Sequence, residues 1–367
     1  MRLNCSRKRL MDSINIVSKA VATRTPMPIL DGILMNASDG LTLTGYDMET
    51  GIEARMEADI LASGSVVVPA RVFTEIVRRL PEDDVFIDTD DKHMVKVESG
   101  SSSFNIRGLS ADDYPALPIV EHDRSLVLEQ KMFKDMIQQT KFAASTDDSR
   151  PILKGINVIF ENGELTLVTI DGFRLAVRKE KIKEDQQEAM QFIVPARAME
   201  DVSHVLSDSD DLVTIGPSHN YVLFDTGNIK IVSRLIQGEF LSYKSILPSG
   251  NKTSLVADPQ VLLSAIERAS IVIDRDEKRF PVTLETPDED TLIISSKTDI
   301  GMSREELSIA LTGELVDIDF NPKLFMDALK EIQDEKITVS FQGSVGPCSI
   351  QPLEGESFFY LVLPLRR

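Results

Sequence analysis

The chain has 367 residues, 42% of them hydrophobic, and a formal net charge of −19 at pH 7. A chain of this length is expected to form two or three globular domains, each large enough to bury a core of its own. It contains no apolar run near the ~18 residues that a membrane helix requires, and residues 1–6 lack the apolar stretch of a secretory signal, so we expect a cytoplasmic protein that does not bind membranes.

The first third of the chain predicts two amphipathic helices, over residues 6–21 and 71–80. In the first helix the apolar residues that share one face are Leu10, Ile14, Val17 and Val21. Their spacing is that of a helix with one buried side. Short runs with β character lie at residues 41–44, 85–89 and 94–98, and the turn-forming residues between them predict antiparallel hairpins.

The same order of elements returns in the other two thirds. The predicted helices there span residues 130–144, 197–206, 259–273 and 323–332, and the predicted strands span residues 165–168, 212–215, 221–225, 292–295, 337–341 and 348–351. Each third is therefore expected to be α+β, with a sheet-rich layer backed by two helices.

Two motifs recur with the spacing of a whole domain. Val-Pro-Ala-Arg at residues 68–71 returns at residues 194–197 and, more weakly, as Asn-Pro-Lys at residues 321–323, so that the prolines are 126 and 127 residues apart. Pro-Ile-Leu at residue 28 likewise returns at residue 151. This period exceeds the ~20 to 50 residues of solenoid repeats. It predicts three domains, residues 1–122, 123–250 and 251–367.

Positive charge is concentrated in the predicted helices. Their formal charges sum to +6, against −25 for the remainder of the chain, within the total of −19. Lys134 and Lys141 lie opposite the apolar stripe of the 130–144 helix, and Arg71 and Arg78 share one face of theirs. Ordinary solvated helix faces explain this pattern. A surface for a polyanion is the alternative, since a basic patch is the electrostatic footprint of nucleic-acid binding.

The sequence shows no recognisable catalytic or cofactor motif. It lacks a phosphate-binding Gly-rich loop and a metal-type His spacing. The histidines are His93, His122, His204 and His219, which are scattered, and the cysteines are Cys5 and Cys348, at opposite ends of the chain. We expect no enzymatic activity, no metal and no cofactor. A hydrolase that uses unrecognised carboxylates is the weaker alternative.

An ordered set of motifs resembles the bacterial replicative sliding clamp, the beta subunit of DNA polymerase III. The motifs are Pro-Ile-Leu near residue 28, Asp-Gly-Phe-Arg-Leu-Ala-Val at residues 171–177, the three Pro-containing helix starts, residues 243–248, and Tyr-Leu-Val-Leu-Pro-Leu-Arg at residues 360–366. The resemblance extends from end to end of the chain. It implies three repeated clamp-type domains, each with antiparallel sheets on the outside and two helices on the inside, and a head-to-tail homodimer that forms a six-domain ring around duplex DNA.

The resemblance also implies a processivity factor that tethers the replicative DNA polymerase and other clamp-binding-motif proteins to DNA, with a clamp loader as a further partner. Contacts to phosphates carry no sequence information, so DNA binding is expected to be independent of sequence. The residue that matches a DNA-facing loop is Arg24, and the helix faces add Arg71, Arg78, Lys134, Lys141 and Arg197. Arg150 is a further candidate, although a structural ion pair beside Pro151 explains it equally well.

A second surface implied by the resemblance is an apolar cleft between the second and third domains, which receives a short peptide from partner proteins. The residues that match its lining are Leu153, Ile170, Gly172, Phe173, Arg174, Leu175, Leu241, Ile246, Val345, Pro347, Leu361, Val362, Leu363, Pro364 and Leu365, with Arg366 at the rim. A mostly apolar concavity suits an anchoring peptide side chain, although alternate residues of 360–365 also fit a core strand. Phe173, Leu241 and Ser245 stand where His, Pro and a basic residue are common in the family, which predicts an altered peptide preference.

For the dimer interface, the resemblance pairs Phe104 and Ile106, on an expected edge strand, with Ile271 and Val272, at an expected helix end. A heterologous contact of this kind can close into a ring, and an unpaired strand edge is a ready partner. Without the resemblance, a place in a domain core is the better interpretation of both pairs. The alternative function is an acidic multidomain scaffold that binds peptides and does not encircle DNA.

Overall fold

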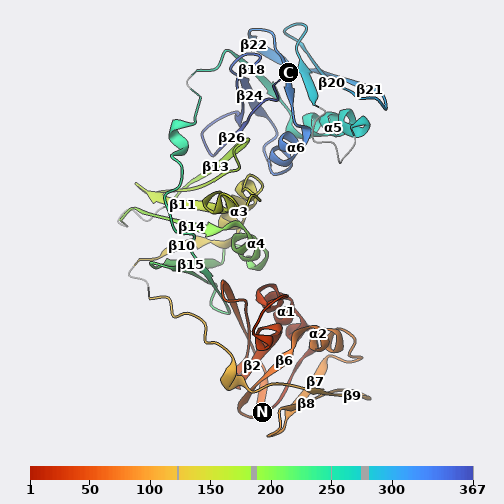
Figure 1. The fold of residues 1–367 in the computed structure, drawn as a ribbon, viewed down its shortest axis with the longest axis vertical. Coiled ribbons are helices and arrows are strands. Elements are labelled where there is room, and N and C mark those ends of the chain that lie inside the picture. The colour runs from red at the N-terminus through yellow and green to blue at the C-terminus, as the bar shows by residue number, and fades with distance from the viewer. Residues whose placement is uncertain (122–123, 183–187, 249, 274–280, 367) are drawn as a thin grey trace. The chain divides into compact units, whose positions relative to one another are not determined.

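The computed structural model describes residues 1–121, 124–182, 188–248, 250–273 and 281–366 (Figure 1). The chain forms two compact units. The first comprises Met1–Lys134 and Asp201–Leu235, and the second comprises Asp135–Glu200 and Ile236–Arg367. The division passes through the middle third of the sequence because that third adds strands to a sheet in each unit.

The first unit contains two sheets. Five strands follow the order β5 (Asp59–Ala62), β1 (Arg2–Ser6), β7 (Asp84–Thr89), β8 (Met94–Ser99) and β9 (Ser102–Arg107). Eight strands follow the order β10 (Leu126–Glu129), β15 (Leu212–Pro217), β16 (Tyr221–Asp225), β17 (Ile229–Arg234), β4 (Thr50–Met56), β3 (Gly40–Tyr46), β2 (Gly32–Ser38) and β6 (Gly64–Pro69). The larger sheet crosses from the middle third into the first because β17 pairs with β4, where Ile231 lies opposite Ile52.

The second unit repeats this arrangement. Nine strands follow the order β14 (Met190–Pro195), β11 (Gly155–Glu161), β12 (Glu164–Ile170), β13 (Arg174–Lys181), β26 (Phe358–Val362), β25 (Cys348–Pro352), β24 (Ile337–Phe341), β18 (Thr253–Ala257) and β22 (Ala310–Gly313). Four strands follow the order β21 (Met302–Ser308), β20 (Thr291–Lys297), β19 (Val282–Glu285) and β23 (Asp317–Phe320). Here β13 pairs with β26, so Leu175 of the middle third lies opposite Leu361 of the last.

All six predicted helices are present. They are α1 (Arg7–Val17), α2 (Ala70–Arg78), α3 (Gln130–Lys141), α4 (Ala196–Val205), α5 (Pro259–Ala269) and α6 (Pro322–Lys330). The Ser6 side chain caps α1 by accepting a hydrogen bond from the Arg9 backbone N–H at 3.4 Å. Leu10, Ile14 and Val17 are fully buried, as the periodicity predicts. In the first unit α1 packs beside α2 (Figure 1).

The recurring Pro-Ile-Leu motif forms the same structure twice. It makes a 3-10 turn at Pro28–Asp31 and again at Pro151–Lys154, and each turn leads into a strand that begins with glycine. A Cβ atom on Gly32 would lie 2.4 Å from the Val67 side chain, and one on Gly155 would lie 2.4 Å from the Ile193 side chain. The glycine in each copy is therefore required by the close approach of the neighbouring strand.

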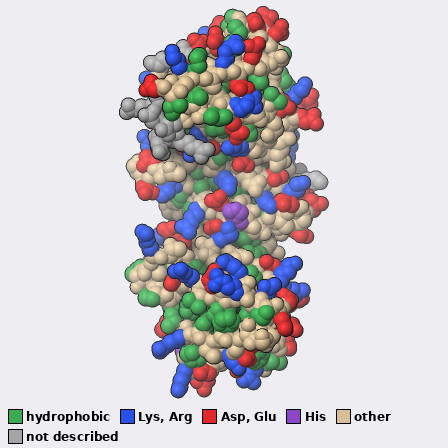
Figure 2. Space-filling model, turned by 90° about the vertical axis from the view of Figure 1, so that its right-hand side faces the viewer, with side chains coloured by type: hydrophobic (Ala, Val, Ile, Leu, Met, Phe, Trp, Pro, Cys, Tyr) green, Lys and Arg blue, Asp and Glu red, His purple; other side chains and the backbone are tan. Residues whose placement is uncertain are grey.

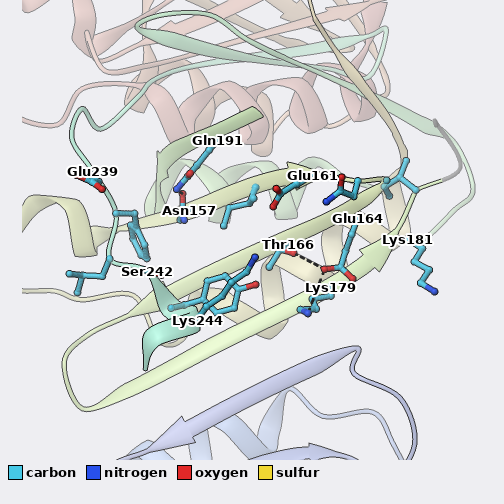
Figure 3. Close-up of a pocket in the computed structure, with 17 residues that line it drawn as sticks. Asn157, Glu161, Glu164, Thr166, Lys179, Lys181, Gln191, Glu239, Ser242 and Lys244 are labelled. Atoms are coloured by element: carbon cyan, nitrogen blue, oxygen red, sulfur yellow. Dashed lines mark hydrogen bonds and ion pairs between the residues drawn. The ribbon is translucent and has the colours of Figure 1, made fainter. Parts of the chain in front are cut away.

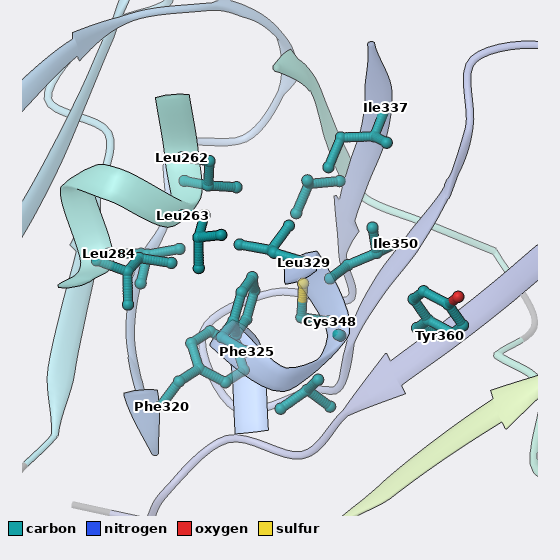
Figure 4. Close-up of a cluster of buried hydrophobic side chains, with 14 of the residues drawn as sticks. Leu262, Leu263, Leu284, Phe320, Phe325, Leu329, Ile337, Cys348, Ile350 and Tyr360 are labelled. Atoms are coloured by element: carbon teal, nitrogen blue, oxygen red, sulfur yellow. The ribbon is translucent and has the colours of Figure 1, made fainter. Parts of the chain in front are cut away.

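The core of the last third is formed mainly by aromatic and branched aliphatic side chains (Figure 4). Phe320, at the end of β23, meets Phe325 of α6 edge-on, with 5.0 Å between the ring centroids. Leu329 of α6 and Leu262 of α5 complete this layer, so the two helices cover one side of the core. Burial of this kind supplies most of the stability of a helix-on-sheet layer.

Every strand pairing within the described residues is antiparallel, as the hairpin pattern predicts. The two junctions between repeats, β17 with β4 and β13 with β26, have no counterpart in the sequence pattern. Across the part of the chain that the structure describes, no helix combines the length and apolar character of a membrane span.

Candidate peptide site and nucleic-acid surface

The residues matched to a peptide cleft include a compact apolar cluster in the second unit. Its buried members are Leu153, Val168, Ile170, Leu175, Val177, Ile193, Phe240, Tyr243 and Leu361. Strands β12, β13 and β26 supply most of them, and Phe240 and Tyr243 come from the segment that follows residue 235. Four of the predicted lining residues thus lie together: Leu153, Ile170, Leu175 and Leu361.

Large apolar side chains beside this cluster are open to solvent. Phe173 is 65% exposed, Leu241 54% and Leu363 40%, and the Leu363 backbone N–H donates to the Phe173 carbonyl at 2.8 Å. Ile246 is also exposed. We call the buried cluster and these exposed neighbours the peptide site. Exposed apolar groups around a buried apolar base are typical of a protein interaction surface.

A tight turn presents Phe173 to solvent. The Asp171 carboxylate accepts hydrogen bonds from the backbone N–H groups of Phe173 at 2.9 Å and Arg174 at 3.0 Å. Gly172 between them has a φ of +94°, a conformation that side chains other than glycine rarely adopt. The sequence Asp-Gly-Phe therefore fixes the direction of the phenylalanine ring.

The Arg174 side chain contacts two carboxylates and an aromatic ring of the protein itself. Its side chain is 10% exposed and lies 2.9 Å from the Asp171 carboxylate and 2.7 Å from the Asp327 carboxylate of α6. Its guanidinium also lies over the Phe142 ring, 5.5 Å from the centroid. The charge of Arg174 is neutralised within the protein, so the residue holds the turn in place and leaves little charge for a ligand.

Arg150 lies next to the peptide site. A Cβ atom on Gly172 would be 3.9 Å from an Nη atom of Arg150. The Arg150 side chain is exposed and makes no direct ion pair with a described carboxylate. Hydrogen bonds from Ser149 and, after them, the charge of Arg150 lower the pKa of the Asp147 carboxyl, so the attraction considered from the sequence exists without a direct contact. Arg150 supplies a cation beside the apolar surface, a position that the sequence did not suggest.

The remaining residues matched to the cleft differ in how deeply they are buried. Val362 is buried in the separate core of the last third, because alternate residues of β26 face opposite sides of the sheet. Val345 and Arg366 are exposed, and Pro347, Pro364 and Leu365 are partly buried. The Leu365 backbone N–H donates to the Asp319 carbonyl at 2.8 Å, which fixes the end of the described chain against β23.

The candidate DNA-binding cations differ in whether a carboxylate of the protein pairs with them. Arg24, Arg71 and Arg197 are exposed, and no carboxylate among the described residues pairs with them. Arg78 pairs with Glu75 of its own helix at 2.6 Å. Figure 2 shows Lys and Arg side chains gathered in the lower part of the view, on the side of Figure 1 where α1 and α2 lie, with acidic side chains among them.

The two candidate lysines of α3 are bound to neighbouring acids. Lys134 lies 2.8 Å from the Asp208 carboxylate in the first unit, and Lys141 lies 2.8 Å from the Glu200 carboxylate in the second. Their side chains are 18% and 27% exposed. Because the acidic partners are 74% and 48% exposed, these pairs are worth little to stability, yet they reduce the local positive charge. The free arginines are thus the stronger candidates for contact with phosphate.

The residues matched to the dimer interface lie at sheet edges or beside them. Phe104 and Ile106 are on β9, an edge strand, and Ile271 and Val272 form the 3-10 turn after α5. Ile271 is 78% exposed. The sequence did not single out Ile300 and Met302, which are 76% and 74% exposed and lie at or beside the start of the edge strand β21. Their only sequence signal is an apolar residue on each side of Gly301.

The candidate reactive groups do not come together. Cys5 and Cys348 are buried, and burial raises the pKa of the Cys5 thiol to about 12. His204 lies 3.2 Å from the Lys19 amine, and His122 lies outside the described residues. In the segments that the structure covers, no three His, Cys, Asp or Glu side chains form a group that could hold a metal ion.

Three family descriptions match successive parts of the chain. They are DNA polymerase III beta subunit, N-terminal domain, over residues 1–118, central domain over residues 127–241, and C-terminal domain over residues 244–366. A beta sliding clamp of Halalkalibacterium halodurans is 35% identical over 380 residues, with each chain fully covered.

Solved structures agree with these sequence matches. The DNA polymerase sliding clamp of Bacillus subtilis has a TM-score of 0.96 to this chain at 34% identity, and the match covers 100% of this chain and 99% of that one. A sliding clamp of Pseudomonas aeruginosa bound to griselimycin has a TM-score of 0.94 at 26% identity, with both chains fully covered.

Proposed function

Because the chain belongs to the DNA polymerase III beta subunit family of sliding clamps and has its three-domain fold, we propose that it is a non-catalytic processivity factor that encircles duplex DNA. In this role it tethers the replicative DNA polymerase and other proteins with a clamp-binding motif. We place it in the cytoplasm, loaded onto DNA by a clamp loader. The domain boundaries that we propose are those of the repeats, 1–122, 123–250 and 251–367; residues 122 and 123 lie outside the described part of the chain.

DNA contact is proposed to be weak and independent of sequence. The exposed arginines Arg24, Arg71 and Arg197 support this role, because they can meet phosphates without competing carboxylates from the described residues. Phosphate contacts carry no base information and permit movement along the duplex. A closed ring needs little affinity, since its topology prevents dissociation.

We propose that two copies join head to tail into a six-domain ring. The edge strand β9 offers unpaired main-chain groups and the exposed ring of Phe104. The edge strand β21 also offers unpaired main-chain groups, and the exposed side chains of Ile271, Ile300 and Met302 are its apolar neighbours. Edge pairing supported by apolar burial is a common form of β-sheet association. These two surfaces are different, so the contact is heterologous, and two such contacts close a dimer.

The peptide site is proposed to receive the clamp-binding segments of partner proteins. Its support is the exposed apolar rim of Phe173, Leu241 and Leu363 around a buried base. A sliding clamp of Pseudomonas aeruginosa that shares this fold has been crystallised with griselimycin, which supports a ligand site on the fold. The Phe173 ring makes the site more apolar than a histidine would, so we propose a preference for apolar peptide anchors.

Retention on circular DNA tests the proposed function. The protein is loaded with its clamp loader onto a nicked plasmid, isolated by gel filtration in moderate salt, and the plasmid is then cut once. We expect retention on the circle and loss after linearisation, because a ring slides off a free end. Equal retention on both forms would identify a conventional DNA binder, and no retention on either would favour the peptide-binding scaffold that does not encircle DNA.

The dimer is tested by substitution of Ile271 and Val272 with Asp. We expect monomers in multi-angle light scattering, because two charges at the centre of an apolar contact are unfavourable. Leu353→Asp is the control, since Leu353 is 50% exposed and lies outside both proposed edges. An intact dimer in the double variant would refute the assignment of this edge.

A further inference from the structure

A polar cavity of about 750 Å³ lies over one face of β11, β12 and β13 in the second unit (Figure 3). We propose that this cavity binds an acidic residue next to the apolar anchor of a partner peptide, with Lys244 as its cation. The inference rests on the proposed peptide-binding function and names a second, polar determinant of it. No residue of the cavity was singled out from the sequence for this purpose.

The cavity adjoins the peptide site through a shared wall. Leu241 lines the cavity and is also one of the exposed apolar residues of the peptide site. Phe240 and Tyr243 likewise line the cavity and belong to the buried apolar cluster. A peptide anchored on the apolar side therefore needs to extend only past Leu241 to enter the polar side.

The change from apolar to polar follows from strand register. On the same face of the sheet, Asn157 lies opposite Val168, and Ile159 lies opposite Thr166 in the next row. Thr166 in turn lies opposite Lys179, and Glu164 lies opposite Lys181. On β12 and β13 the side chains of this face thus change from valine to threonine, lysine and glutamate with distance from the peptide site, whereas β11 presents Asn157, Ile159 and Glu161 in the same rows.

The floor of the cavity contains a buried amide. Asn157 is 1% exposed, and its Oδ1 accepts a hydrogen bond from Gln191 at 3.2 Å. The N–H groups of the same amide donate to no described residue, and they are not among the fully buried polar atoms that lack a partner, so they stay open to the cavity. An acceptor group of a ligand in the cavity can accept a hydrogen bond from them.

The lysines that line the cavity differ in whether a carboxylate neutralises them. Lys179 is held by Glu164 at 3.5 Å and by Glu356 at 3.9 Å. Lys244 is exposed and has no carboxylate partner among the described residues. Figure 3 shows Lys244 extending across the strands into the cavity, whereas Glu239 lies at its margin. Lys181 also lines the cavity and is exposed, but Figure 3 shows it at the opposite end of the strands, so Lys244 is the free cation at the end where Ser242 lies.

The main chain beside Lys244 is also available. The backbone groups of residues 238–241 make no hydrogen bond to any described residue. An extended peptide can pair with such a segment while its side chains enter pockets on either side. An acidic side chain in the cavity would then accept hydrogen bonds from the Lys244 amine and the Asn157 amide, both on one side of Leu241.

A phage-displayed library of random twelve-residue peptides tests the proposal. Selections are run on the wild type, on Lys244→Gln, Lys244→Glu and Lys244→Arg, and on the matched control Lys252→Gln, an exposed lysine that does not line the cavity. We expect an apolar core in every selection. An acidic residue beside that core is expected to be enriched with the wild type, Lys244→Arg and Lys252→Gln, lost with Lys244→Gln, and replaced by a basic residue with Lys244→Glu.

Affinity measurements give the size of the effect. For a selected peptide, Glu→Gln at the flanking position is expected to weaken wild-type binding about five-fold, the effect of one charge-assisted contact, and to leave Lys244→Gln unchanged. Flanking residues without charge preference, or a preference that survives Lys244→Gln, would overturn the inference while the apolar core still supports the peptide site. Selected peptides whose binding is unaffected by Phe173→Ala combined with Leu363→Asp would instead contradict the peptide site itself.

Discussion

Arginine occurs in opposite environments in the peptide site and on the helices of the first unit. Arg174 is 10% exposed and lies between two carboxylates, whereas Arg71 on α2 is exposed and has no carboxylate partner among the described residues. The buried cation determines geometry, so its loss disturbs a whole turn. The exposed cation contributes to a diffuse field, in which each charge matters little and the sum matters more.

The comparison predicts a large effect from removing the buried cation. Arg174→Met leaves the Asp171 and Asp327 carboxylates, which are 15% and 26% exposed, without their shared partner. We expect a loss of about 2 kcal/mol in the free energy of unfolding, below the range for a fully buried pair because the carboxylates retain some water. Urea denaturation followed by circular dichroism measures it.

The matched variant is Arg71→Met, which removes the same charge from an exposed helix face. Its unfolding free energy is expected to change by less than about 0.5 kcal/mol. Similar losses in both variants would show that the ion pairs of Arg174 contribute no more than a surface charge. The distinction between the two regions would then be wrong.

Within the peptide site, peptide affinity and the stability of the fold are expected to respond differently to the loss of one exposed ring. Phe173 is 65% exposed, so Phe173→Ala removes little buried area from the fold. We expect the affinity for a clamp-binding peptide to fall about ten-fold, as is common for an aromatic anchor at the centre of an interface. Fluorescence anisotropy measures the affinity, and the melting temperature should stay the same.

Leu353→Ala provides the control for Phe173, since Leu353 is 50% exposed and lies outside the peptide site. Peptide affinity is expected to be unchanged in this variant. If both variants weaken binding equally, the effect comes from a general change in the second unit. Phe173 would then have no special place in the surface.

The elements that could be predicted from the sequence are those with a local signal. Leu10, Ile14 and Val17 repeat with helical spacing and are buried, and the recurring Pro-Ile-Leu forms the same turn in two repeats. The pairing of β17 with β4 could not be predicted, because a strand edge has no sequence pattern that names its partner. Family resemblance supplied the peptide-site residues, four of which the fold gathers into one cluster.

The side-chain contacts of the peptide site could not be predicted from local sequence patterns, because they join residues that are far apart in the chain. The ion pair of Arg174 with Asp327 joins residues 153 positions apart, and either residue alone fits an ordinary exposed charge. Arg150 was assigned to DNA from its charge, whereas its place beside Gly172 depends on the fold of the following 3-10 turn. The polar cavity depends on register, which determines that Asn157, Thr166 and Lys179 share one face.

The smallest predicted effect concerns single charges on the helix faces. Arg71→Gln is expected to change the affinity for open, linear duplex DNA by less than about two-fold, because one exposed contact in a diffuse set contributes little. Replacing Arg24, Arg71 and Arg197 together should lower the affinity further and reduce the slope of log affinity against log salt by about 0.9 for each lost phosphate contact. Filter binding over a range of salt concentrations measures both quantities.

The control for this series is Arg55→Gln, which removes an exposed arginine that pairs with Asp39 at 2.5 Å and lies on β4, away from both proposed dimer edges. Its salt slope should match that of the wild type, because a cation already paired with a carboxylate releases few ions from DNA. A full loss of binding from Arg71→Gln alone would mean that one arginine makes a specific, directional contact. The helix faces would then resemble the peptide site, where a single side chain decides the outcome, and sliding would need to break that contact at every step.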